Sequence, residues 1–213
     1  MSVIRFTSIA RKFIMALSGL FLVVFLLVHL GVNLLMLSSD PDLFNSASHF
    51  MATNPLIQVM QYVLALGFLI HIMLGIALTV QNKHARPTAY ASDKPGENSG
   101  IESRTMIYTG GLVLLFLILH MRNFFYYIKF GTVPEGGDYV LVADLFDIWY
   151  YTLIYVVSFV LLGLHLNHGF QSSFQSLGAS NKSWAMVWKK AGTIYSVVVA
   201  AGFSIIALYH FFN

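Results

Sequence analysis

Five long apolar stretches dominate the chain, and shorter stretches rich in turn-forming residues separate them. The apolar stretches cover residues 13–37, 55–80, 106–128, 149–171 and 192–212. A helix of about 20 apolar residues crosses the hydrocarbon core of a membrane. The pattern therefore predicts an all-α membrane protein with five transmembrane helices. The stretches between them carry Pro, Gly, Asn, Ser and Asp, which favour loops, so residues 1–213 are expected to form a single transmembrane domain.

Composition agrees with a membrane protein. Of the 213 residues, 57% are hydrophobic and 10% are charged, whereas soluble domains have about 25% charged residues. The chain has no cysteine, which excludes disulfides and iron–sulfur clusters held by its own thiolates. The net charge of +3 is small and its cations are spread over several loops, which argues against nucleic-acid binding. The first apolar stretch is longer than the core of a signal peptide, at about 7–15 residues, so we expect it to be retained.

Lysines and arginines are distributed unevenly between the two predicted ends of the helices. One end carries ten of them: Arg5, Arg11, Lys12, Lys83, Arg86, Lys94, Arg104, Lys182, Lys189 and Lys190. The other end carries only Arg122 and Lys129. Because cytoplasmic segments of membrane proteins are enriched in Lys and Arg, the N-terminus is expected to be cytoplasmic and the C-terminus external.

Each of the first four apolar stretches contains an intramembrane histidine: His29, His71, His120 and His165. Ionisable residues inside a membrane are costly and usually functional. Counting along each helix at about 1.5 Å per residue places His29 and His120 at an outer level and His71 and His165 at an inner level, roughly 15 Å apart. His168 lies one turn after His165 and could replace it as a ligand, although the depth of His165 matches that of His71 better.

Two imidazoles at one level are typical of haem, whose iron takes an axial ligand on each face. A bare zinc or di-metal site needs three or four ligands at one level, often carboxylates. No Asp or Glu lies in the five apolar stretches, and Asp147 lies just before the fourth. We therefore expect the first four helices to form a four-helix bundle around two b haems. Glycines near the inner level would make room for porphyrin, although small residues also serve plain helix packing in membranes; they are Gly19, Gly75, Gly110 and Gly169.

Several other polar residues are candidates for contacts with haem propionates or a quinone. Arg122 lies two residues after His120 and could bond to propionates or extend to the lipid headgroups. Arg11, at the inner end, could likewise bond to propionates or extend to the lipid headgroups. His168 could contact a propionate or a partner subunit.

Polar residues in the first predicted outer loop could exchange protons with a quinone, although an ordinary loop would have the same composition. They are Asp40, Asp42 and His49. His84 is expected to be solvated in a loop. His210 is expected at the membrane interface, without a partner.

Taken together and in order, these motifs resemble the single-subunit di-haem cytochrome b anchors of succinate dehydrogenases and fumarate reductases. The resemblance covers nearly the whole chain and depends on Gly19-Leu20, His29-Leu-Gly-Val-Asn33, His71-x-x-x-Gly75, His120 and His165-x-x-x-Gly169. It implies that His29 and His120 bind a distal haem, and that His71 and His165 bind a proximal one. Asn33 then becomes a further candidate for propionate or quinone contact.

The resemblance also implies partners and a location. An iron–sulfur subunit and a flavoprotein would bind the cytoplasmic face, where the flavoprotein oxidises succinate or reduces fumarate. A quinone, usually menaquinone in such proteins, would react near the distal haem. The protein would then be a multi-pass protein of a bacterial inner membrane, and no catalytic residue can be assigned in this chain.

The chain departs from some of these relatives at two places. Gly163 occupies a position where certain members carry a glutamate, and no glutamate lies between residues 38 and 58. These departures leave the proton route and the quinone contacts open. Two rival interpretations remain: a di-haem quinol-oxidising anchor of another respiratory reductase, and a haem-free transporter that uses its histidines as a proton relay.

Overall fold

The computed structural model describes residues 7–84 and 101–213, and all regular structure in these ranges is helical. The prediction of five long apolar helices is confirmed. The segments that are long and apolar enough to cross a membrane are Ser8–Leu37, Pro55–Asn82, Thr105–Phe130, Trp149–Ser176 and Ala185–Phe212.

Three of these segments are single helices, namely α3 (Pro55–His84), α8 (Trp149–Ser176) and α9 (Ala185–Phe212). The first segment combines α1 (Ser8–Asn33) with the 3₁₀ turn η1 (Leu34–Leu37). The third combines α5 (Ile101–His120), the π-helix η2 (Met121–Phe125) and α6 (Tyr126–Phe130). The π-helical turn begins directly after His120, and such turns are frequent at functional sites.

Two segments that were expected to be loops contain helices, so this part of the prediction was wrong. They are α2 (Pro41–Thr53) and α7 (Asp138–Asp147). The residues that indicated turns in fact start helices. Asp40 caps α2 by accepting a hydrogen bond from the backbone N–H of Asp42 at 3.1 Å, and Pro41 occupies the first helical position, where its missing N–H costs nothing.

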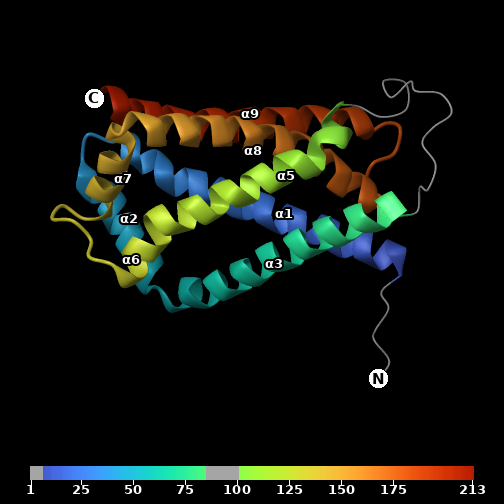
Figure 1. The fold of residues 1–213 in the computed structure, drawn as a ribbon, viewed down its shortest axis with the longest axis horizontal. Coiled ribbons are helices and arrows are strands. Elements are labelled where there is room, and N and C mark those ends of the chain that lie inside the picture. The colour runs from blue at the N-terminus through green and yellow to red at the C-terminus, as the bar shows by residue number, and fades with distance from the viewer. Residues whose placement is uncertain (1–6, 85–100) are drawn as a thin grey trace.

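These two helices dock against each other at one end of the molecule, near α6 and the C-terminus (Figure 1). The Asn45 side chain of α2 donates to the Gly136 carbonyl and accepts from the Tyr139 backbone N–H, each at 2.9 Å. The Ser48 hydroxyl donates to the Asp138 carboxylate. His84, also expected in a loop, is instead the exposed last residue of α3.

Helices α8 and α9 pack along each other, α1 packs against α3 and α8, and α5 packs against α8 (Figure 1). The core lies where α1, α8 and α9 meet and includes Tyr155, Phe159, Val199 and Phe203. Helix α3 packs mainly on α1, and none of its most apolar stretch is buried. Its remaining surface therefore suits contact with lipid.

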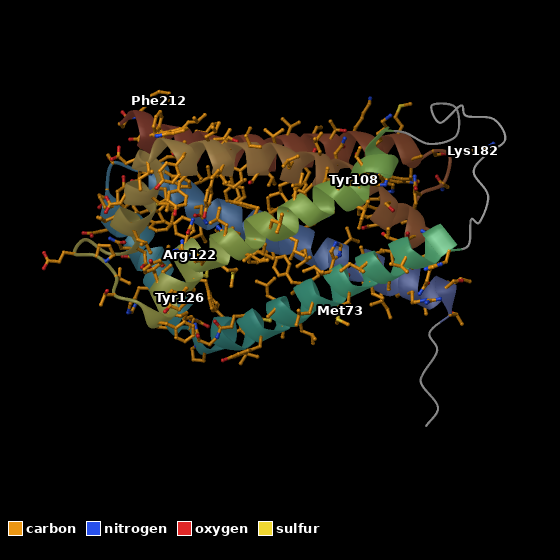
Figure 2. All side chains as sticks on the ribbon, viewed as in Figure 1. Met73, Tyr108, Arg122, Tyr126, Lys182 and Phe212 are labelled. Atoms are coloured by element: carbon orange, nitrogen blue, oxygen red, sulfur yellow. The ribbon has the colours of Figure 1, made fainter. Side chains whose placement is uncertain are left out.

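Successive long helices run in opposite directions, so the described lysines and arginines lie at the two ends of the bundle. Figure 2 shows Lys182 at one end of the bundle and Phe212 at the other, with Arg122 and Tyr126 nearer to Phe212. Arg11 lies in the first turns of α1, at the same end as Lys182. Among the described residues the two ends of the bundle thus differ in charge in the predicted sense. Arg5, Arg86 and Lys94 lie outside the described residues, and the cytoplasmic location of the basic end stays a prediction.

Candidate functional site

The four intramembrane histidines meet as two pairs, one from α1 and α5 and one from α3 and α8. The ring centres of His29 and His120 are 5.8 Å apart with planes at 88°, and those of His71 and His165 are 6.4 Å apart with planes at 77°. Two imidazoles on opposite sides of one metal ion, with metal–nitrogen distances of about 2.0–2.1 Å, have ring centres roughly 6 Å apart. Each pair is therefore spaced to hold one metal atom between its rings.

Two hydroxyls show that the pairs lie at different depths. The Ser18 Oγ is 3.3 Å from Nδ1 of His71, and the Thr109 Oγ1 is 3.4 Å from Nδ1 of His165. Ser18 precedes His29 by 11 residues, and Thr109 precedes the outer histidine of α5 by the same number. At a rise of about 1.5 Å per residue, both helices separate the two levels by about 16 Å. This spacing agrees with the value expected from the sequence.

The same hydroxyls favour one tautomer of the inner histidines. Ser18 Oγ donates to the Met15 carbonyl at 2.9 Å, and Thr109 Oγ1 donates to the Met106 carbonyl at 3.1 Å. A hydroxyl has a single hydrogen, so while it donates to the carbonyl its oxygen can accept from a protonated Nδ1 of the histidine. The tautomer with the proton on Nδ1 keeps the Nε2 lone pair, which is the form that binds a metal.

Aromatic side chains surround the outer pair. The Phe25 ring stacks on His29 at 5.4 Å between centres, and Phe203 lies 5.6 Å from the same ring. His120 is surrounded by Phe116, Phe124 and Tyr155.

Polar contacts to the outer imidazoles are sparse. Nδ1 of His120 is buried and has no hydrogen-bond partner among the described residues. The Asn33 amide donates to the His29 carbonyl at 2.8 Å and lies 3.5 Å from Nδ1 of the same histidine. Among the described residues the outer imidazoles are thus less hydrogen-bonded than the inner ones.

Two of the four predicted glycines line the inner pair. A Cβ atom at Gly19 would lie 3.4 Å from Cε1 of His71, and one at Gly110 would lie 3.2 Å from Cε1 of His165. The missing side chains at these positions therefore let both inner imidazoles lie close to the facing helices.

The other two glycines contact methionine. A Cβ at Gly75 would lie 3.6 Å from Cε of Met15, and one at Gly169 would lie 3.5 Å from Cε of Met106. Both distances are ordinary packing contacts. The alternative of plain helix packing therefore applies better to this second pair.

The sequence reasoning missed Ser18 and Thr109, although a signal for them was present. If the first and third spans are aligned on their histidines, Met15 and Met106 both stand 14 residues before the histidine, and the hydroxyl residue and the glycine follow at the same spacing. Phe25 and Phe116 also match, because each stands four residues before the histidine of its helix.

The remaining candidates are not members of the two facing pairs, although His168 lies close enough to His165 to interact with it electrostatically. Arg122 is exposed and its Nη1 donates to the Asn123 Oδ1 at 3.4 Å. His49 is an exposed residue of α2. His168 is half-buried on α8, and it is the His165 ring that faces His71.

Two buried donors at the basic end have no hydrogen-bond partner among the described residues. They are the Arg11 Nε, two turns before Ser18 on α1, and the Gln171 Nε2, six residues after His165 on α8. The sequence had indicated the arginine but not the glutamine. Both suit a negatively charged group between the helices, because a buried donor is costly until it is bonded.

His210 and Gly163 both lie outside the histidine pairs and contact residues of other helices. His210, expected without a partner, lies 3.1 Å through Nε2 from the Met36 carbonyl, and its ring meets Tyr139 edge-on at 5.4 Å. That expectation was wrong because η1 and α7 fold over the end of α9. Gly163 faces α9, since a Cβ there would lie 3.0 Å from the Ala200 Cβ.

The donor set fits haem better than a bare metal ion. Within residues 7–84 and 101–213, no three His, Asp or Glu side chains converge as they would around a protein-bound zinc or di-metal centre. Paired imidazoles in an apolar bundle, with buried donors at one end, could hold a b haem by bis-histidine ligation.

No protein-family model, curated protein or solved structure matches this chain. Its function has to be argued from the geometry of the histidine pairs and from the motifs in the sequence.

Proposed function

We propose that this protein is the membrane anchor and electron-transfer subunit of a succinate:quinone oxidoreductase. The observation that carries the proposal is the presence of two facing histidine pairs, at 5.8 and 6.4 Å between ring centres, on four different helices. Their vertical separation of about 16 Å spans much of the hydrocarbon core, which is about 30 Å thick.

The residues of each site have separate roles in this proposal. His29 and His120 hold a distal b haem, and His71 and His165 hold a proximal one. A bound b haem supplies a one-electron iron couple, whose potential depends on burial and on bonds to its ligands. Arg11 and Gln171, whose buried donors lack partners, bond to the propionates of the proximal group.

The partners follow from the resemblance in the sequence. An iron–sulfur subunit with its flavoprotein docks at the basic end, which is the end nearer the inner pair. The quinone reacts at the other end, where α2 and α7 cover the bundle and the outer pair lies beneath them. The chain then joins dicarboxylate chemistry on a partner subunit to quinone chemistry in a bacterial inner membrane.

A histidine proton relay is less consistent with the site. A relay between the levels needs polar groups or water along its path, but residues 20–28 of α1 and 111–119 of α5 are glycine or apolar throughout. The rings around the outer pair are aromatic as well. A nitrate-reductase type of anchor draws its ligands from fewer helices, whereas here each histidine comes from a different one.

The test is purification of the tagged chain from its own membranes with its partners attached. We expect two b haems per chain, a sharp α band on reduction, and co-purifying iron–sulfur and flavin subunits that reduce the haems when succinate is added. A colourless protein would overturn the proposal. Two haems with a partner of another kind would support the rival reductase instead.

A further inference from the structure

The inner histidine pair has a hydrogen-bonding arrangement that the outer pair lacks. Both inner imidazoles place Nδ1 within 3.4 Å of a hydroxyl, from Ser18 on α1 and from Thr109 on α5. Both hydroxyls are buried, at 9% and 8% residue exposure. At the outer level, Nδ1 of His120 has no partner among the described residues. The two sites therefore differ in the groups that hold their ligands.

The hydroxyls belong to a unit that occurs twice in the molecule. Each donates to a methionine carbonyl three residues earlier, at 2.9 and 3.1 Å. Each is followed by a glycine whose missing side chain lets the imidazole approach. While the hydroxyl hydrogen is donated to the carbonyl, a lone pair of the oxygen is available to the ring. Two helices thus present the same acceptor to two different histidines, and at His165 the Met106 backbone is a second hydrogen-bond partner.

We propose that Ser18 and Thr109 are positioning residues that orient His71 and His165 and lower the reduction potential of the proximal haem alone. This inference rests on the proposed function, because it assigns a role toward a haem at the inner pair. Neither hydroxyl would contact the haem iron. Each bonds to Nδ1 of its histidine and acts on the iron through Nε2 of the same ring.

The expected direction follows from ligand basicity. A histidine that donates its Nδ1–H to an acceptor is a more basic ligand through Nε2, and its ring orientation is fixed. A more basic ligand favours the oxidised, more positively charged iron. Removing the acceptor should therefore raise the potential of that haem. If the preference for the oxidised iron falls tenfold, the potential of a one-electron couple rises by about 59 mV.

The experiment is an optical redox titration of the intact protein in its membranes, with the variants Ser18→Ala, Thr109→Ala and both together. Ser18→Thr and Thr109→Ser retain the hydroxyl and should restore the original potential. The matched control is Ser196→Ala, because this buried serine on α9 donates to the carbonyl three residues earlier, at 2.9 Å, and forms no hydrogen bond with a histidine among the described residues.

The parent protein should show two haem midpoint potentials. The inference is supported if one of them rises in each alanine variant while the other is unchanged. Loss of one pigment with the other retained, reversed by the hydroxyl-retaining variants, would support it as well. If neither potential moves, or both move equally, the inference is overturned and the proposed function stands. If the parent protein contains no haem, both are overturned together.

Discussion

Replacing His71 with phenylalanine should remove one of the two proposed haems and leave the other in place. The substitution deletes one imidazole of the inner pair, whose ring centres are 6.4 Å apart. The outer pair lies about 16 Å away, or about three helical turns, so the substituted side chain cannot contact it. The haem content should fall from two per chain to one.

Double substitutions make this prediction sharper. His165→Phe added to His71→Phe removes the second ligand of a site that is already lost, so one haem should still remain. His120→Phe added to His71→Phe destroys both sites, and no haem should remain. If two separate sites each need two histidines, the haem losses caused by two substitutions in the same pair do not add. The losses caused by substitutions in different pairs do add.

Haem content per chain can be measured from the spectrum of the pyridine complex, with protein determined independently. His168→Phe serves as the control and should retain both haems, because the His165 ring is the one that faces His71. If the inner double variant lost both pigments, or if His71→Phe retained both, the pairing argued from the ring geometry would be refuted.

Three further substitutions test the surrounding packing. Gly110→Val should abolish the inner haem while the outer one is retained, because even a Cβ there lies 3.2 Å from the Cε1 of His165; the residual spectrum measures this. The buried Asn123 amide donates to the Tyr155 hydroxyl at 3.1 Å. Tyr155→Phe removes this acceptor and should lower the free energy of unfolding by about 1–2 kcal/mol in a thermal or denaturant assay. Gly163→Leu should separate α8 from α9 and destabilise the protein by about 1–3 kcal/mol while haem ligation persists.

Two of these predictions have an internal control in the chain. A Cβ at Gly111 would meet no described atom within 4 Å apart from its chain neighbours and the nearby backbone of its own helix, so Gly111→Val should retain both haems. Tyr150 is 44% exposed and Tyr150→Phe should leave stability unchanged. If Gly163→Leu removed haem as strongly as Gly110→Val does, α9 would have to be part of the haem site, contrary to our interpretation.

The sequence predicted the five long helices because a run of apolar residues has one outcome in a bilayer, where every backbone group must bond within its own helix. It also predicted which histidines lie at one level, because depth follows from the residue count along a rigid helix. It failed for α2 and α7. There the same residues, such as Asp40-Pro41, mark both turns and helix starts, and docking onto neighbouring helices decides between them.

Side-chain partners were harder to predict than positions. Ser18 and Thr109 look like ordinary small polar residues in their own helices, and their significance depends on which histidine a neighbouring helix brings to them. His210 was expected to be alone because Met36, whose carbonyl it contacts, lies 174 residues away in the sequence. Contacts of this kind depend on helix packing, which the hydrophobic pattern leaves open.

The histidine pairs reveal an internal relation between the two halves of the bundle. Helices α1 and α5 share the methionine, hydroxyl, glycine, phenylalanine and histidine spacing, and α3 and α8 share His-x-x-x-Gly. His29 faces its own counterpart His120, and His71 faces its own counterpart His165. Equivalent residues of the two halves therefore face each other in both pairs. Each half contributes one histidine to each level, so the spacing of about 16 Å is set twice by the same 11-residue step in α1 and α5.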